Sequence, residues 1–460
     1  MDDSHESHAV DIECLARQLR EELAAAEAPA ARPASGCPVV IAEVPALTRN
    51  VDPAEYEPHH VAVGPYHRAK NPDLARDDDK ARCLAAVLST ASAAGVTLEA
   101  CLAEVAGLDG RARSCYASAF DQIGAAEFVR MLLLDACYLL VRFGGVGAGA
   151  GGAPLLCGGV MEAVAVVRDV FYLAENQIPF FVLDRIHRLA APDAGVSARD
   201  AIARYARELL RRRQFSVATP AVAAPPGTGP GNLLHLLHMH LTPTALLSPR
   251  TSASKATGNG KRRFGRWRSA TEYHCAGVGF RARPLAGKDA RSILDVRLDG
   301  RGGALEIPCL NVDAETPRLL RNLMALEQSN SAAAGRHVTA YCVFVSQLAC
   351  TARDVELLSR RGVISHGLGS DGEVAELFAD LCKGVAFGAD DPGGNYLHAT
   401  WEAMEGRFRC RPRRWASWLM LRYFRNPWLA VGLAAAAVGL LCTVVQAVFA
   451  VLSYYTPRGT

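Results

Sequence analysis

The sequence predicts a mainly helical α+β body with a small antiparallel β-meander, followed by one C-terminal transmembrane helix. Three observations lead to this fold class. Residues 428–452 are apolar and carry no charge. Apolar residues recur with helical spacing through most of the preceding chain. Period-two alternation, which is typical of half-buried strands, is confined to residues 277–312.

The stretch from Trp428 to Leu452 is long enough to cross a bilayer as a helix. About 25 residues at about 1.5 Å each reach roughly 37 Å, which exceeds a hydrocarbon core of about 30 Å. Gln446 is its one strongly polar side chain, whereas a buried helix of a large soluble core would normally show a polar face. Trp428 at one end, and Tyr454 and Tyr455 at the other, suit the two membrane interfaces. Since only eight residues follow Leu452, we expect a tail anchor.

Basic residues gather directly before this span. They are Arg407, Arg409, Arg411, Arg413, Arg414, Arg422 and Arg425, whereas Arg458 alone follows the span. Because cationic residues are retained on the cytoplasmic side, the body is predicted to face the cytosol. The acidic N-terminus, MDDSHESHAVDIE, lacks a secretory signal and agrees with this orientation. Each arginine would also attract anionic lipid by about 1 kcal/mol. The long span favours the plasma membrane over thinner endomembranes.

Composition excludes several classes of function. The chain has 50 basic and 47 acidic residues, so no nucleic-acid partner is expected. Half of its 460 residues are apolar, which is ample for one large domain or two ordinary ones. Its 14 cysteines contain no CxxC pair, so we expect reduced, structural cysteines rather than a zinc ribbon. The motifs GxSxG and HExxH, a P-loop and kinase signatures are absent, so neither an enzymatic activity nor a cofactor is predicted.

Shifts in composition predict the domain organisation. Residues 1–37 are expected to form a mobile arm, 38–426 a globular domain, 427–455 the anchor and 456–460 a short tail. Within the globular domain, variable loops are expected at 144–160 and 214–268. The first is rich in glycine and alanine, and the second in proline, glycine and basic residues.

Helical periodicity predicts most of the regular structure. The expected helices are Leu74–Ala94, Leu98–Leu108, Ala126–Phe143, Met161–Leu189, Ala198–Arg213, Thr316–Gln328, Val338–Ser359, Glu373–Leu381 and Tyr396–Phe424. Pro179 must break the fourth of these near Ile178, because proline lacks a donor and clashes with the preceding turn. Ser197 is well placed to cap the fifth. Strands are expected within 277–284, 292–300 and 304–312, with a hairpin at Gly302-Gly303.

Two groups of histidines could carry chemistry. The sequence LLHLLHMH places His235 and His238 on one helical face, with His240 nearby. Three imidazoles could bind zinc, but no carboxylate or cysteine in the segment completes a site. Partly buried histidines at a helix end are therefore the favoured interpretation. In EPHHVAVGPYHR, His59, His60 and His67 could act as general bases, but no nucleophile stands out beside them.

Two further segments have the composition of binding motifs. Gly147–Gly152 formally fits GxGxxG, and Asp169 lies about 20 residues further on. A helical pattern rather than a strand precedes this glycine-alanine run, so a flexible loop is predicted. A basic-aromatic patch contains Lys261, Arg262, Arg263, Phe264, Arg266, Trp267 and Arg268. It could engage acidic lipid, an acidic partner or a nuclear-import receptor, or it could be a solvated loop.

Several segments occur in a characteristic order along residues 38–455. They are EPHHVAVGPYHR, AEFVRMLLLDACYLL, DVFYLAENQIPFFVLDRI, SATEYHCAGVGFR, ILDVRL…LEIPCL, TPRLLRNLMALEQ, DVELLSRRGVI and YFRNPWLAV. Together they resemble the plant-specific "domain of unknown function two-four-seven" family. The resemblance implies a mainly helical body with a small β portion, a single C-terminal span and no established catalytic activity. Some grass members of that family are implicated as pollen-side determinants of self-incompatibility.

The resemblance also implies structural roles for three groups of motif residues. These roles are a turn after an early strand, a polar-to-apolar helix break whose amides cap freed backbone groups, and a similar buried set. The turn comprises Gly64, Pro65 and Tyr66, the break comprises Glu175, Asn176, Gln177, Pro179 and Phe180, and the buried set comprises Asn322, Glu327 and Gln328. Asn426 and Pro427 belong to the motif that leads into the span.

We therefore expect a membrane-anchored recognition or scaffold module, acting in signalling or self-recognition, with no chemistry of its own. Its expected partners are the lipid bilayer and unidentified proteins. One alternative is an enzyme with an unfamiliar site built around His59, His67 and Glu175. Another is a structural, membrane-organising protein whose span self-associates through Gly432 and Ala436 at small-xxx-small spacing.

Overall fold

The computed structural model describes residues 39–92, 94–146, 159–192, 195–217, 229–247, 268–286, 290–299, 303–388, 394–409 and 427–455. The predicted arm at 1–37, the tail at 456–460 and most of both predicted variable loops lie outside these residues. The same holds for most of the basic-aromatic patch and for the motif residue Asn426. The arginines expected to set the topology, Arg411, Arg413, Arg414, Arg422 and Arg425, also lie outside.

Helices dominate the described chain, which confirms the mainly helical fold class. The first half contains α2 (Ala46–Arg49), η1 (Pro53–Tyr56), α3 (Pro65–Arg68), η2 (Pro72–Ala75), α4 (Asp77–Ser92), α5 (Leu98–Ala106), α6 (Asp109–Arg113), α7 (Ala125–Leu139), η3 (Leu140–Gly144), α8 (Val160–Val167), η4 (Arg168–Tyr172), α9 (Phe180–Ala190) and α10 (Ala198–Arg212). The second half contains α11 (Leu233–His240), α12 (Thr244–Leu247), α13 (Ala270–Cys275), α14 (Thr316–Ser329), α15 (Ser331–Ala334), α16 (His337–Leu348), α17 (Ala352–Arg360), α18 (Asp371–Leu381), α19 (His398–Arg409) and α21 (Pro427–Tyr455).

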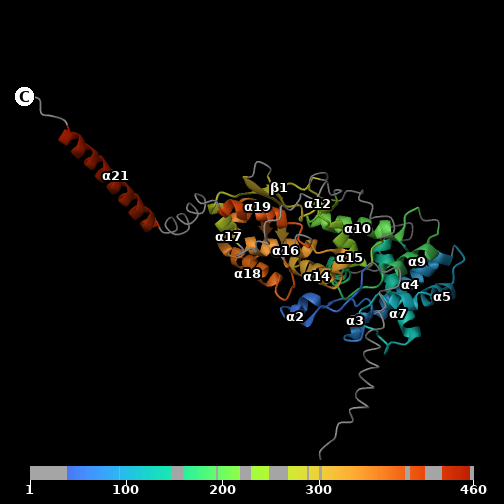
Figure 1. The fold of residues 1–460 in the computed structure, drawn as a ribbon. Helices are drawn as coiled ribbons and strands as arrows, with labels where there is room; N and C mark the ends of the chain where they lie inside the picture. The colour runs from blue at the N-terminus through green and yellow to red at the C-terminus, as the bar shows by residue number, and fades with distance from the viewer. Residues whose placement is uncertain are drawn as a thin grey trace, which may run out of the picture.

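The helices form an elongated body (Figure 1). Helices α4, α5, α7 and α9 lie at one end, and α16 to α19 lie at the other. Helix α7 packs against α4, α5 and α9, and its residues from Phe128 to Leu139 are buried except for Arg130. Arg130 instead reaches the surface, where its Nη1 lies 2.9 Å from Oδ2 of Asp77. The body therefore has a helix at its core whose sequence carries apolar residues on every face.

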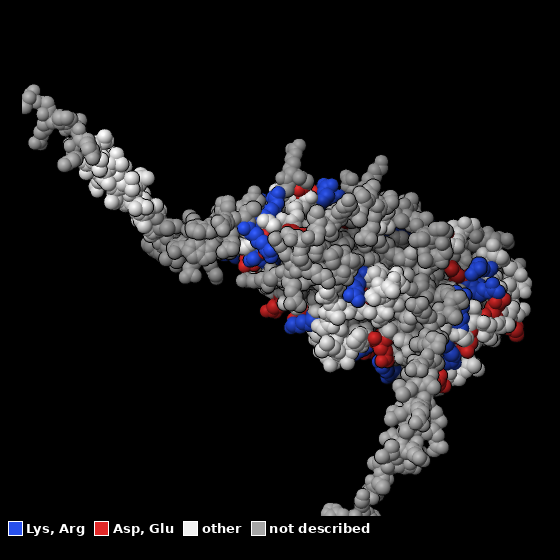
Figure 2. Space-filling view, in the orientation of Figure 1, with Lys and Arg blue, Asp and Glu red and all other residues white. Residues whose placement is uncertain are grey.

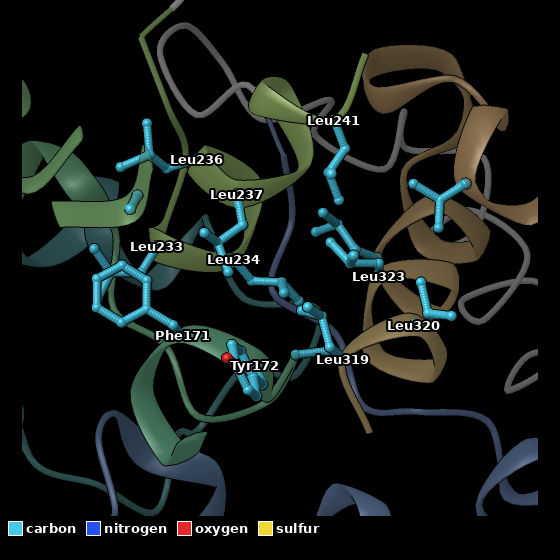
Figure 3. Packing of buried hydrophobic residues seen from close by; sticks show 14 of the residues in the cluster. Phe171, Tyr172, Leu233, Leu234, Leu236, Leu237, Leu241, Leu319, Leu320 and Leu323 are labelled. Atoms are coloured by element: carbon cyan, nitrogen blue, oxygen red, sulfur yellow. The ribbon is translucent and has the colours of Figure 1, made fainter. Parts of the chain in front are cut away.

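The junction between the halves is an apolar layer (Figure 3). Phe171 and Tyr172 of η4 face Leu233 and Leu237 of α11, and α14 adds further leucines. Those leucines are Leu319, Leu320 and Leu323. Buried apolar residues from Val39 to Phe408 belong to one contiguous cluster, so the described body shares a single core.

Most predicted helices are present, with informative differences at their ends. Ser197 caps α10 as predicted, because its Oγ accepts a hydrogen bond from the Asp200 amide at 3.1 Å. The break at Pro179 is wider than expected, since regular structure stops at Tyr172 and resumes at Phe180. The single helix predicted for 338–359 is wrong: α16 ends at Leu348, and Thr351 caps a new helix.

The strands do not form the antiparallel meander that the sequence predicted. Strand β3 (Ala304–Pro308) pairs in parallel with β1 (Gly279–Arg283) and antiparallel with β2 (Arg297–Leu298), in the order β1-β3-β2. The antiparallel pairing of β2 with β3 agrees with the predicted hairpin. Strand β4 (Leu310–Val312) pairs in parallel with β5 (Ile364–His366), a strand that was not predicted.

The residues between β1 and β2 explain why these two strands are not neighbours in the sheet. The amide of Ile293 donates to the Phe215 carbonyl at 2.9 Å, and the amide of Val217 donates to the Arg291 carbonyl at 2.7 Å. The chain therefore leaves β1 to pair with the segment after α10 before it returns as β2. Strand β2 then pairs with one edge of β3, and β1 pairs with the other edge.

Candidate functional site

Buried polar side chains fix an extended segment, residues 58–64, against the helices of the body. The carboxylate of Asp169 accepts hydrogen bonds from the amides of His59, His60 and Val61, at 2.6 to 3.2 Å. Asn176 continues the pattern, because its Oδ1 accepts from the Val63 amide at 2.6 Å and its Nδ2 donates to the Val61 carbonyl at 2.9 Å. The backbone here is satisfied mainly by side chains, with the Leu74 carbonyl accepting from the Ala62 amide at 2.7 Å, and not by a neighbouring strand.

A buried ion pair completes this attachment. Nζ of Lys80, on α4, lies 2.5 Å from Oδ1 of Asp135, on α7, and both side chains are fully buried. Nζ of Lys80 also donates to the Ala62 carbonyl at 2.6 Å, and Oδ2 of Asp135 accepts from the Gly64 amide at 2.8 Å. The pair thus joins two helices to the same piece of extended chain.

The expected turn at Gly64, Pro65 and Tyr66 is present, but no regular strand precedes it within residues 39–63. Gly64 has a φ of +75°, and a Cβ at this position would overlap the carbonyl oxygen of Gln177. Pro65 starts α3, and the Tyr66 hydroxyl donates to the Ile41 carbonyl at 3.1 Å. The expected early strand is reduced to an isolated bridge at Ile41, because side chains supply the partners that a strand would use.

Glu175 and His67 meet in the core, as the enzyme alternative required. Oε2 of Glu175 lies 3.4 Å from Nε2 of His67, and Oε1 accepts from the Val44 amide at 2.5 Å and contacts Arg49. Burial, with Lys70 and Arg49 nearby, lowers the pKa of His67 to about 3. His59 is exposed and contributes only its backbone amide to Asp169.

A second buried cluster joins three helices. His238 of α11, Glu327 of α14 and His337 of α16 have ligand atoms that all lie within 4.8 Å of one another. Nε2 of His238 lies 2.8 Å from Oε1 of Glu327, and Nδ1 of His337 lies 3.8 Å from the same oxygen. His235 lies on the same face of α11, with its ring centroid 6.1 Å from that of His238. His240 is half-buried and does not belong to the cluster.

The electrostatics of this cluster favour uncharged imidazoles. Burial lowers the pKa of His238 to about 4 and that of His337 to about 3, and it raises the pKa of Glu327. Glu327 accepts four hydrogen bonds: from the Val338 amide, from the Thr339 amide and hydroxyl, and from His238 if its Nε2 carries the proton. Neutral imidazoles beside a carboxylate are the donor set that transition metals prefer.

Helix α21 is the remaining candidate, as the part that could meet a membrane. Its segment Ala434–Leu452 has a mean hydropathy of 2.3, and it is long and apolar enough to cross a bilayer. No part of that segment is buried in the body, and α21 stands apart from the other helices (Figure 1). Gly432, Ala436 and Gln446 are all exposed on it.

Charges on the visible face of the body are mixed in sign (Figure 2). Arg268, the one member of the basic-aromatic patch that the structure describes, pairs with Glu405 through Nε at 3.0 Å. Its guanidinium also lies over the ring of Phe408, 3.6 Å from the centroid. Arg268 is therefore held against α19.

Comparison with known proteins gives the family. Residues 41–442 match DUF247, described as "Plant protein of unknown function". The chain belongs to the DUF247 family. This finding confirms the resemblance that the sequence motifs indicated.

Two Arabidopsis thaliana proteins are relatives of this DUF247 chain. The UPF0481 protein At3g47200 is 24% identical over 449 residues, which cover 91% of this chain and 87% of the relative. A second UPF0481 protein, At3g02645, is 35% identical over 118 residues, which cover 25% of this chain and 21% of the relative. No solved structure matches the chain.

The remaining DUF247 motif residues lie at joints between elements. Gln177 donates to the Val170 and Leu173 carbonyls and accepts from the amides of Leu233 and Leu234, so it joins η4 to the start of α11. Oδ1 of Asn322 accepts from the Ala174 amide, and its Nδ2 donates to the Glu55 and Arg318 carbonyls. Pro179 directly precedes α9. Gln328 is half-buried and donates to the Ala386 carbonyl.

Sequence reasoning missed three residues of the buried network and one of the histidine cluster. Lys80 and Asp135 were not singled out, and Asp169 was considered only as part of a glycine-rich motif. His337 was missed because it starts a helix far along the chain from His238. A buried charge on an otherwise apolar helix face, as at Asp135, was the one available signal.

Proposed function

We propose that this protein is a membrane-anchored recognition or scaffold module whose helical body faces the cytosol. One observation carries the proposal: α21 exposes a continuous apolar surface that no part of the described body covers. Its large apolar side chains are between 46% and 69% exposed, and they are Val431, Val438, Leu440, Leu441, Val444, Val445, Val448, Phe449, Val451 and Leu452.

The magnitude of this exposure supports a lipid environment. Full burial of such a side chain stabilises by roughly 1.5 to 3 kcal/mol. For ten side chains that are about half exposed, transfer from water into lipid is worth on the order of 10 kcal/mol. Few soluble helices leave so much apolar surface in contact with water.

The proposed orientation rests on the arginines that precede the span. Arg411, Arg413, Arg414, Arg422 and Arg425 precede the span directly in sequence. The rule that such residues stay in the cytoplasm places the body there. The length of the span supports the plasma membrane, whose sterol-rich bilayer is thicker than that of endomembranes.

The absence of catalysis is also part of the proposal. Glu175 and His67 are the strongest candidates for an active site, and each side chain is 1% exposed. Oε1 of Glu175 already contacts Arg49 and the Val44 amide, so it helps to hold the chain at α2. A substrate would have to displace these contacts to reach the pair.

Recognition by the body is supported by exposed apolar residues at α8. Val160 and Met161 are 82% and 81% exposed, and they lie at the end of the glycine- and alanine-rich stretch of the sequence. Exposed apolar side chains of this kind are typical of protein interaction sites. Loops also tolerate the variation that partner specificity requires.

Proximity labelling from the N-terminus tests this function in plant cells. Three chains are compared: the intact chain, a chain that ends at Pro427, and a chain whose residues 428–455 are replaced by an unrelated membrane span. We expect the first and third to label the same small set of membrane proteins and the second to lose it. If the intact chain labels only the cytosolic background, the recognition role is wrong.

A further inference from the structure

We propose that His238, Glu327 and His337 form a buried zinc site that holds α11, α14 and α16 together. The three side chains come from three helices of the second half of the chain, and their ligand atoms all lie within 4.8 Å of one another. All three are at least 95% buried, so a metal bound here would hold the helices together and would not be accessible to substrates.

The geometry is close to that of a tetrahedral site. Zinc-to-nitrogen and zinc-to-oxygen bonds of about 2.0 to 2.2 Å set neighbouring ligand atoms roughly 3.4 Å apart. Here Oε1 of Glu327 lies 2.8 Å from Nε2 of His238 and 3.8 Å from Nδ1 of His337. Both separations are within about 0.6 Å of that tetrahedral value, and all three ligand atoms lie within 4.8 Å of one another, so rotations of the side chains would admit the ion.

Hydrogen bonds already orient the carboxylate. Oε2 of Glu327 accepts from the Thr339 amide at 2.7 Å and from the Thr339 hydroxyl at 2.6 Å. Oε1, on the side of the two histidines, accepts from the Val338 amide at 2.8 Å and keeps a second lone pair with which it would bind the metal. Partners that orient a ligand in this way are a regular feature of metal sites.

The His337 ring also carries a buried nitrogen without a hydrogen-bond partner, on the side opposite to its proposed ligand atom. The side chain of His337 is buried, with 5% of its surface exposed, and its Nε2 makes no hydrogen bond within the described structure. Leaving such a group unsatisfied costs roughly 1 to 3 kcal/mol. A metal ion bound to one ring nitrogen fixes the tautomer and can move the ring so that the other nitrogen finds a partner.

The donor set excludes the alkaline-earth ions. Two imidazoles and one carboxylate suit zinc, as they also suit iron(II), whereas calcium and magnesium require oxygen ligands. His235 does not supply the fourth ligand, because its Nδ1 accepts from the Gly231 amide at 3.0 Å and its proton then occupies Nε2. We assign the fourth position to water, as in other sites with two histidines and one glutamate.

Without a metal, the same residues form a hydrogen-bonded cluster. His238 would donate to Oε1 of Glu327, and the carboxylate would cap the first turn of α16 through the Val338 and Thr339 amides. This arrangement is the competing outcome of the experiment. It predicts a folded protein with no bound zinc.

The test measures zinc in the full chain, purified in detergent without chelators and equilibrated with micromolar zinc before desalting. Elemental analysis by mass spectrometry should give about one zinc per chain for the native sequence. His238→Gln and His337→Gln should each lower this content at least about tenfold. His187→Gln is the matched control, because His187 is an equally buried histidine outside the cluster, and it should retain the zinc.

A second measurement covers the case in which the variants fail to fold. Cobalt(II) added to the metal-free native chain should give the visible absorption bands of a tetrahedral nitrogen-oxygen site, and zinc should displace it. The proposal is overturned if the native chain holds less than about a tenth of an equivalent of zinc and shows no such bands. Equal zinc in His337→Gln and the native chain would overturn it as well.

Discussion

Replacement of Lys80 by methionine should destabilise the body strongly. The substitution removes the ammonium that lies 2.5 Å from Oδ1 of Asp135 and 2.6 Å from the Ala62 carbonyl oxygen. Asp135 would then remain as a buried charge without its counter-ion, which costs about 3 to 5 kcal/mol. At roughly 2 °C per kcal/mol for a domain of this size, the melting temperature should fall by about 5 to 10 °C.

Thermal unfolding of the full chain in detergent, followed by intrinsic fluorescence, measures this shift. Lys70→Met is the matched control, because Lys70 is exposed, and it should change the melting temperature by less than about 1 °C. The double variant Lys80→Met with Asp135→Asn should recover much of the loss, since asparagine still accepts from the Gly64 amide but carries no charge. A Lys80→Met variant as stable as the native chain would refute the reasoning.

Two further predictions concern single positions in the same body. Gly95→Ala should reduce the free energy of unfolding by about 1 kcal/mol, and Gly64→Ala by several times as much. Both glycines have positive φ, but only Gly64 lies against the Gln177 carbonyl. Equal denaturation midpoints for the two variants would contradict this prediction. Burial and the neighbouring His238 lower the pKa of His235 from 6.5 to about 3, so its neutral form stabilises the fold fully above pH 6.5. That stability is lost by about 1.4 kcal/mol per pH unit as the pH falls toward 3. His235→Gln should therefore show a shallower loss of stability between pH 7 and 5 in urea titrations, and an unchanged slope would contradict the assignment.

Local patterns predicted the elements that depend on local interactions. The cap at Ser197, the break before Phe180 and the hairpin between β2 and β3 all follow from residues within a few positions of one another. Helix α21 was also predictable, because an uncharged apolar run needs no knowledge of its surroundings.

Contacts between distant segments were beyond the sequence patterns. Glu327 lies 89 residues from His238, and its carboxylate completes a cluster that the segment LLHLLHMH could not supply by itself. The parallel pairing of β1 with β3 depends on the excursion through Ile293, which alternation of apolar residues does not reveal. The family resemblance implied an early strand before Gly64, yet most partners of the extended segment near Val61 are side chains.

The apolar helix α21 is central to the proposed function, and membrane extraction tests it most directly. Membranes from plant cells that express the chain are washed with alkaline carbonate, which removes peripheral proteins. The intact chain should remain in the membrane pellet, and a chain that ends at Pro427 should appear in the soluble fraction. A chain without residues 1–37, a deletion of similar size, should stay in the pellet. Resistance of the Pro427 chain to carbonate would contradict the account.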